Sequence, residues 1–170
     1  KEANSVLVKV LEDTNQEPMV RHEAAEALGA IGCSDSIEIL ERYLYDPVIE
    51  VAETCQLALE RIKYYQQNEN EKLPENPYKS VDPAPPSVVK SVDELKAILL
   101  DENESLFNRY RAMFTLRNLR TEKAIEALGA GLKCGSALFR HEVAFVMGQM
   151  QDEKSIKYLI ESLKDSNENE

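Results

Sequence analysis

The chain has 170 residues, of which 43% are hydrophobic and 30% are charged, and its formal net charge is −11 at pH 7. This composition predicts one or two small folded cores and excludes a disordered chain. The excess of acid would repel a phosphate backbone, so no nucleic-acid partner is expected, and no apolar run is long enough for a membrane span. The first residues, KEANSVLVKV, lack the pattern of a secretory signal, so a cytoplasmic protein is expected.

Four segments predict helices that begin in the same way. They are PMVRHEAAEALGAIG from Pro18, PVIEVAETCQLALER from Pro47, LFNRYRAMFTLRNLR from Leu106 and ALFRHEVAFVMGQMQ from Ala137. The first two begin 29 residues apart and the last two 31 residues apart, which is the period of a solenoid of helix hairpins. The prolines are expected in the first helical turn, and Gly32 is expected at the break between two paired helices.

Shorter second helices complete these hairpins. They are predicted at about residues 36–45, 122–132 and 153–164, the last with an apolar stripe of Ile156, Leu159, Ile160 and Leu163. No strand pattern competes with them. The expected fold class is therefore all-α, an α-solenoid of helical-hairpin repeats.

A proline-rich stretch separates the two pairs of repeats. Five of the seven prolines lie between Pro74 and Pro86, a density that forbids helix and favours an extended path. We predict an N-terminal half at residues 1–66, a linker at 67–91 and a C-terminal half at 92–170. Asp93 is expected to cap the first helix after the linker.

The two ends of the chain resemble each other. SVLVKVLEDTNQE, before Pro18, matches SIKYLIESLKDSNENE, which ends the sequence. The repeat phase therefore predicts a segment that begins with the second helix of one hairpin and stops before the first helix of another. Such a segment would leave apolar faces exposed at its ends, through which copies are expected to associate.

The only two histidines occupy the same place in the repeat. VRHE ends at Glu23 and FRHE ends at Glu142, at the same phase of two equivalent helices. This duplication predicts a metal-ligand set of His22, Glu23, His141 and Glu142, with both pairs exposed on the same face of their repeats. Imidazole and carboxylate without thiolate suit iron(II), manganese or zinc, and mixed His and Glu ligands around two irons form a known oxygen-activating arrangement.

Two further expectations concern this motif. Successive helical residues point about 100° apart, so each pair is expected to serve neighbouring ions, or one ion and its surroundings, rather than to chelate one ion. A structural reading is also open, because a histidine near a helix start can be a hydrogen-bonded core residue and a glutamate there suits the helix dipole. Arg21 and Arg140 are expected in structural salt bridges.

The glycines and cysteines are read from their places in the repeats. Gly29 and Gly148, late in their helices, favour close backbone approach or room for a ligand. Cys33, Cys55 and Cys134 are widely spaced without a C-x-x-C, which predicts reduced thiols, with Cys55 in the core.

Several segments together resemble the deoxyhypusine hydroxylase family across nearly the whole chain. They are RHEAAEALGAIG, DPVIEVAETCQLAL, SVDPAPP, RYRAMFTLRN and CGSALFRHEVAFVMGQMQ. The resemblance implies HEAT-like repeats in two halves and an iron-dependent monooxygenase. Its implied substrate is the deoxyhypusine side chain of the hypusine-bearing translation initiation factor.

The resemblance also implies four His-Glu motifs, two in each half, that hold two Fe(II) ions and activate O2. His22 and Glu23 match the second motif, and His141 and Glu142 match the third. The first and fourth would lie outside this chain. It is therefore expected to carry half of the ligands and to be inactive by itself.

The acidic composition agrees with the substrate that the resemblance implies, since an acidic groove would attract a long cationic amine. The sequence does not decide which carboxylates would hold that amine, and neither Glu26 nor Glu53 is assigned. The alternative is a metal-free HEAT-type scaffold that binds a protein partner. A phycobilin lyase, which shares such repeats, gives no reason for paired His-Glu helices.

Overall fold

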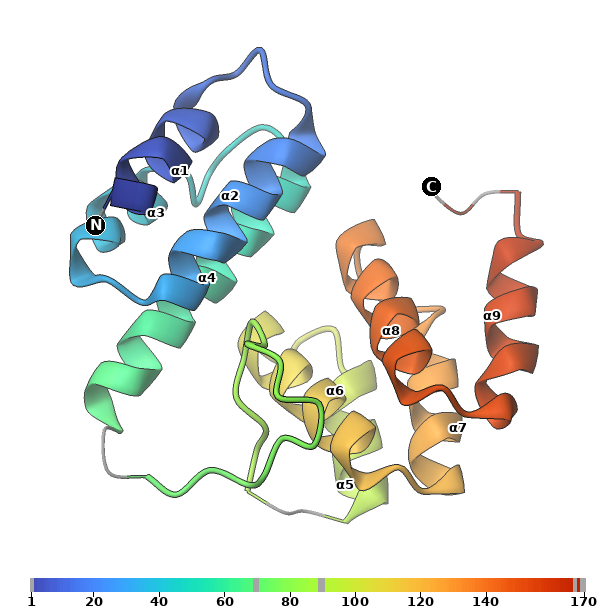
Figure 1. Ribbon diagram of the computed structural model, residues 1–170. Helices are drawn as coiled ribbons and strands as arrows, with labels where there is room; N and C mark the ends of the chain where they lie inside the picture. The colour runs from blue at the N-terminus through green and yellow to red at the C-terminus, as the bar shows by residue number, and fades with distance from the viewer. Residues whose placement is uncertain (1, 69–70, 89–90, 167, 169–170) are drawn as a thin grey trace. The chain divides into compact units, whose positions relative to one another are not determined.

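The computed structural model describes residues 2–68, 71–88, 91–166 and 168, and within them helices are the only regular secondary structure (Figure 1). The predicted all-α fold of HEAT-like hairpins is confirmed. The chain divides into two compact units, residues 1–72 with 81–84 and residues 73–80 with 85–170. Within the described ranges, no helix combines the length and the apolar character that crossing a membrane would require.

The first unit contains two layers of helices. Its helices are α1 (Glu2–Glu12), α2 (Pro18–Ile31), α3 (Ile37–Arg42) and α4 (Ile49–Gln67). The first helices of the hairpins, α2 and α4, pack side by side, while α1 covers α2 and α3 covers α4. The core between them consists of apolar side chains that include Leu11, Leu28, Leu40, Val51, Cys55, Leu59 and Ile62.

Glycine and proline set the limits and the packing of α2. Pro18 occupies the first turn as predicted, and Gly32 ends the helix with a φ of 70°, in the left-handed region that suits glycine. A Cβ at Gly29 would lie 2.7 Å from the Cβ of Ala58. The glycine therefore allows α2 and α4 to approach closely.

Pro47 is not in the first turn of α4, contrary to the prediction. The Oδ1 atom of Asp46 accepts a hydrogen bond of 2.9 Å from the N–H of Val48. This side-chain turn occupies the residues around the proline, so the helix begins at Ile49 instead.

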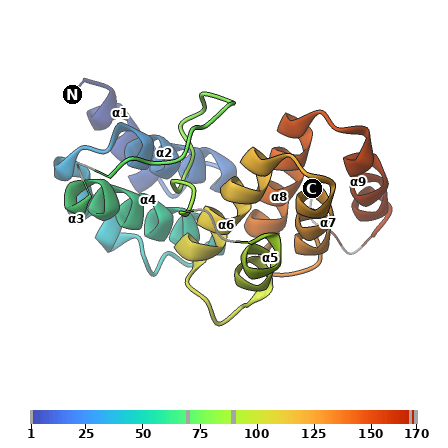
Figure 2. The ribbon, with the colours of Figure 1, turned by 90° about the horizontal axis from the view of Figure 1, so that it is seen from below.

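The second unit repeats the two-layer arrangement. Its helices are α5 (Val92–Leu100), α6 (Leu106–Leu119), α7 (Glu122–Gly131), α8 (Ala137–Met150) and α9 (Ile156–Leu163). The first helices, α6 and α8, form one layer and are covered by α5 and α7 (Figure 2). The core includes Leu95, Leu99, Tyr110, Phe114, Leu116, Leu128, Phe139, Val143 and Met147.

The cap of α5 also differs from the prediction. Ser91, not Asp93, is the N-cap: its hydroxyl accepts from the N–H of Glu94, whose carboxylate accepts from the N–H of Ser91. This reciprocal capping box satisfies two helix-terminal donors at once. Asp93 lies two residues further on, inside the first turn of the helix.

The described part of the proline-rich stretch forms no helix, and it turns at residues 76–79, where the N–H of Lys79 donates to the carbonyl of Asn76. It is packed rather than free. In the second unit, the buried guanidinium of Arg117 donates to the side chains of Asn76 and Ser80. In the first unit, Arg61 donates to the carbonyl of Asp82 at 3.0 Å and to that of Gly29 at 2.7 Å. Residues 69–70 and 89–90 of the predicted linker lie outside the described residues, and its limits at 67 and 91 stay predictions.

Candidate metal centre

A buried arginine precedes the first histidine and fixes the start of its helix. The side chain of Arg21 donates to the carbonyl of Leu11, at the end of α1, and to the carboxylate of Asp46, in the loop before α4. Arg109 takes the same place in α6 and donates to the carbonyl of Leu99, also ten residues upstream. These arginines tie successive hairpins together, so the structural role predicted for Arg21 is confirmed.

Asp46 remains charged beside Arg21. Burial by itself would raise the pKa of Asp46, but hydrogen bonds from Arg21 and from the N–H of Val48 hold that pKa below its ordinary value of 3.8. The charged pair, 2.6 Å apart, fixes the loop that leads into α4. It therefore helps to set the position of α4 beside the first histidine.

His22 is buried between α2 and α4, with only 5% of its surface exposed. Its Nδ1 atom lies 2.7 Å from the hydroxyl of Thr54, on α4. Its Nε2 atom lies 3.6 Å from a carboxylate oxygen of Glu23, whose side chain is 70% exposed. One ring nitrogen thus faces the core, and the other faces a carboxylate that reaches solvent.

Glu26 joins this pair, which sequence reasoning did not foresee. His22, Glu23 and Glu26 can each offer one ligand atom such that all three atoms lie within 4.8 Å of one another. Burial raises the pKa of Glu26, and the negative charges of Glu23 and Asp82 raise it further. The sequence spacing does indicate it, since Glu26 follows His22 by four residues and so lies on the same helix face.

The donor set around His22 fits a metal ion. Two ligands that are each about 2.1 Å from a metal lie roughly 3–4 Å apart, and the atoms of His22 and Glu23 are 3.6 Å apart. These atoms are therefore close enough to share one ion, and whether they do so stays a prediction. Imidazole with two carboxylates suits a borderline or hard divalent cation such as Fe(II), Mn(II) or Zn(II).

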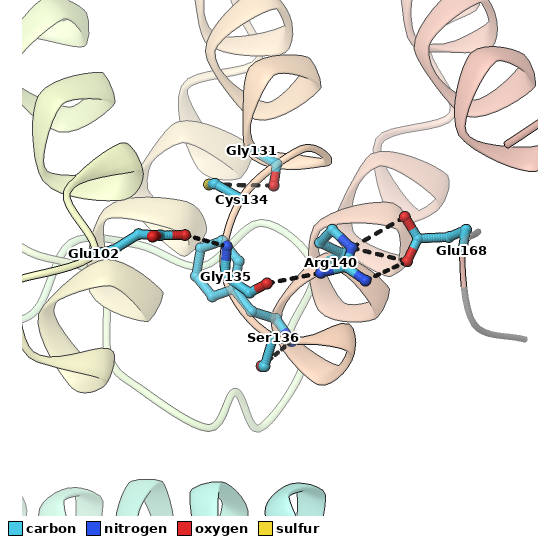
Figure 3. A network of polar contacts seen from close by, with 8 residues as sticks. Glu102, Gly131, Cys134, Gly135, Ser136, Arg140 and Glu168 are labelled. Atoms are coloured by element: carbon cyan, nitrogen blue, oxygen red, sulfur yellow. Dashed lines mark hydrogen bonds and ion pairs between the residues drawn. The ribbon is translucent and has the colours of Figure 1, made fainter.

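The loop before α8, the helix that carries the second histidine, is held by polar contacts (Figure 3). The N–H of Gly135 donates to the carboxylate of Glu102 at 2.8 Å, and Ser136 caps α8 by accepting from the N–H of Phe139. Arg140 donates to the carbonyl of Gly135 and pairs with Glu168 at 2.6 Å. The salt bridge predicted for Arg140 is confirmed.

His141 differs from His22 in its surroundings. It is exposed and forms no hydrogen bond with another described residue, while Glu142 is half-buried. The position that corresponds to Glu26 holds Phe145, which is 54% exposed. Within the described ranges, no other group of three potential ligands gathers as closely as the one around His22.

The expectation that both histidines are exposed alike is therefore wrong. The cause is the first helix of the following hairpin. This helix, α4, packs against the side of α2 that carries His22 and Gly29. Gly148 occupies the corresponding place in α8, and a Cβ there would have no described heavy atom within 4 Å. At the position of the histidine, α6 has Tyr110 and α4 has Val51, and both are buried as His22 is.

The three cysteines are free thiols. Cys55 is fully buried, which confirms its predicted place in the core. Burial raises the pKa of the Cys55 thiol to about 12, so the thiol stays protonated at neutral pH.

Comparisons with known protein families match the N-terminal and C-terminal parts of the chain separately. The HEAT repeats family matches residues 1–60, and the PBS lyase HEAT-like repeat matches residues 109–134 and 139–165. Deoxyhypusine hydroxylase of Drosophila melanogaster is 61% identical over 99% of this chain and 56% of its own length. The human protein of that name is 57% identical over 96% of this chain and 54% of its own length.

A solved structure agrees with these relatives. The structure of human deoxyhypusine hydroxylase in complex with glycerol matches with a TM-score of 0.93 and 56% identity, over 99% of this chain and 58% of that one. The chain thus spans about half the length of the relatives it matches.

Proposed function

We propose that this chain, a close homologue of deoxyhypusine hydroxylases over almost all its residues, contributes iron ligands to an enzyme of that activity. The reaction would be the O2-dependent hydroxylation of the deoxyhypusine side chain of the hypusine-bearing translation initiation factor. The observation that carries the proposal is the convergence of His22, Glu23 and Glu26 within 4.8 Å. It occurs on one of two helices that carry the same Arg-His-Glu motif near their first turn.

The residues suggested as ligands are His22 and Glu23 in the first unit and His141 and Glu142 in the second, with Glu26 added beside the first pair. When bound, iron would supply the activation of dioxygen that no amino-acid side chain can provide. The role of His22 is to present a ring nitrogen from a rigid, buried position. Arg21 and Arg140 support this role by fixing the helix starts before the two histidines.

Charge supports the proposed substrate. A long aliphatic amine is cationic at neutral pH, and the net charge of the chain is −11, so its field attracts such a side chain. Glu23 is 70% exposed at the edge of the ligand cluster, where its carboxylate can either reach the metal or receive an ammonium group.

The number of ligands limits what these residues can do by themselves. Four or five side chains leave a dinuclear site with fewer protein ligands than the Glu and Glu-x-x-His sets of di-iron carboxylate proteins. We propose that further ligands come from outside these 170 residues. The chain by itself should therefore lack hydroxylase activity.

The test is a graft in which this chain replaces the aligned segment of the Drosophila melanogaster protein. We expect the graft to bind iron and to hydroxylate a deoxyhypusine-bearing factor. His22→Ala or His141→Ala in the graft should lower iron content and turnover by more than about a hundredfold, the upper range for the loss of a group that only supports a ligand. Helical content should stay unchanged because repeat stability is distributed along the array.

Glu38→Ala is the control, because Glu38 is an exposed glutamate on α3, away from the ligand cluster, and it should leave both readouts unchanged. Full iron and turnover in either histidine variant would refute the ligand assignment. Turnover by the isolated 170-residue chain as a monomer would refute the need for outside ligands.

The metal-free scaffold remains the second candidate because of one observation on the second unit. Ile160 and Leu163 on α9 are 45% and 86% exposed, and Phe145 on α8 is 54% exposed, so each offers apolar surface that a protein partner could cover. The ligand cluster around the buried His22 argues for the oxygenase, since a scaffold needs no such group.

A further inference from the structure

We infer that Thr54 is a positioning residue for His22: it accepts the N–H of Nδ1 and thereby fixes the tautomer that leaves Nε2 to bind metal. The statement about metal rests on the proposed function, whereas the hydrogen bond and the tautomer do not. Two contacts carry the inference, those of the Thr54 hydroxyl with Nδ1 of His22 and with the carbonyl of Glu50.

The direction of the hydrogen bond follows from counting protons on Thr54. Its hydroxyl oxygen lies 2.7 Å from the carbonyl oxygen of Glu50 and 2.7 Å from Nδ1 of His22. A carbonyl oxygen can only accept, so the single hydroxyl proton is donated to Glu50. The hydroxyl lone pair then faces His22, and Nδ1 must carry the proton that is shared with it.

The opposite tautomer would cost more. If Nδ1 were unprotonated, Thr54 would have to turn its proton toward His22, and its contact with the carbonyl of Glu50 would no longer be a hydrogen bond. A metal ligand that donates its second ring N–H to a fixed acceptor is held in both tautomer and orientation.

The acceptor is rigid because of where it lies. Thr54 is 3% exposed and sits on α4, which Gly29 allows to pack closely against α2. A β-branched side chain within a helix has few rotamers, and the bond to Glu50 selects one of them. The hairpin that follows the His22 helix thus supplies the group that orients the imidazole.

The test uses the metal-free 170-residue chain, whose two imidazoles can be told apart with a single His141→Gln variant. Long-range 1H–15N spectra at alkaline pH, where both rings are neutral, report which ring nitrogen carries the proton. We expect His22 to be protonated at Nδ1. Thr54→Val, which keeps the shape but removes the acceptor, should convert His22 to the Nε2–H form or to a mixture, and Thr54→Ser should restore the Nδ1–H form.

Thr115→Val is the matched control. Thr115 is also buried and donates to the carbonyl four residues before it, that of Arg111 at 2.6 Å, but it lies in the second unit. Its loss should leave the His22 spectrum unchanged. Protonation of Nε2 in the unmodified chain, or a His22 spectrum that Thr54→Val does not alter, would overturn the inference. Since no iron is present, neither result depends on the proposed function, which the iron content of the His22→Ala graft tests separately.

Discussion

The two Arg-His-Glu helices carry the same motif at the same phase, yet they provide different surroundings for their histidines. His22 is buried, is hydrogen-bonded through Nδ1 to Thr54 and has Glu26 one turn further on. His141 is exposed and has Phe145 one turn further on. The repeat therefore sets the position of a side chain on its helix, while the neighbouring helix determines whether that side chain is buried and which hydrogen bonds it forms.

The difference begins with the contacts of the preceding arginines. Arg21 and Asp46 form a pair whose side chains are 4% and 3% exposed, whereas Arg140 and Glu168 are 21% and 24% exposed. Because a buried charge that loses its partner is poorly solvated, the first pair should matter far more for stability.

The largest expected effect is therefore on Arg21. Arg21→Ala should lower the free energy of unfolding by about 3 kcal/mol, because it leaves Asp46 buried and unpaired. Arg140→Ala should cost about 1 kcal/mol or less. Urea unfolding of the 170-residue chain measures both losses, and Arg42→Ala, from the exposed pair with Glu12, provides the baseline. Equal losses for Arg21 and Arg140 would contradict the comparison.

A smaller effect is expected at the two late glycines. Gly29→Ala would place a Cβ 2.7 Å from the Cβ of Ala58 and 2.8 Å from its Cα, and relieving this overlap should cost about 1–3 kcal/mol. Gly148→Ala meets no described atom within 4 Å, so its better helix propensity should stabilise the chain by about 0.5 kcal/mol. Thermal unfolding of the two variants gives the signs. A stabilising Gly29→Ala would show that α2 and α4 are not in close contact there.

Much of the fold could be predicted because single residues impose it. Gly32 ends α2 and Pro18 begins it, as their backbone preferences require, and the spacing of apolar residues indicates the second helices. Pro47 and Asp93 differ from the prediction because a neighbouring side chain, that of Asp46 or of Ser91, accepts a hydrogen bond from the backbone there. Which side chain accepts from the free N–H groups at a helix start depends on the local backbone geometry, which residue type alone does not give.

The site could be predicted only in part. Repeat phase predicts His22 and His141 as ligands, and the four-residue spacing between His22 and Glu26 indicates that they share a helix face. Thr54 could not be found in this way, because it lies 32 residues from His22 and meets it only through the packing of α4 on α2. The burial of His22 was missed for the same reason.

Anomalous diffraction at the iron edge, from crystals of the iron-loaded graft, tests the central claim most directly. The account predicts an iron peak at about 2.1 Å from Nε2 of His22, with Nδ1 still on the hydroxyl of Thr54. It also predicts iron bound by the imidazole of His141. Iron bound elsewhere, or a His22 ring that remains on Thr54 with no metal at Nε2, would contradict it.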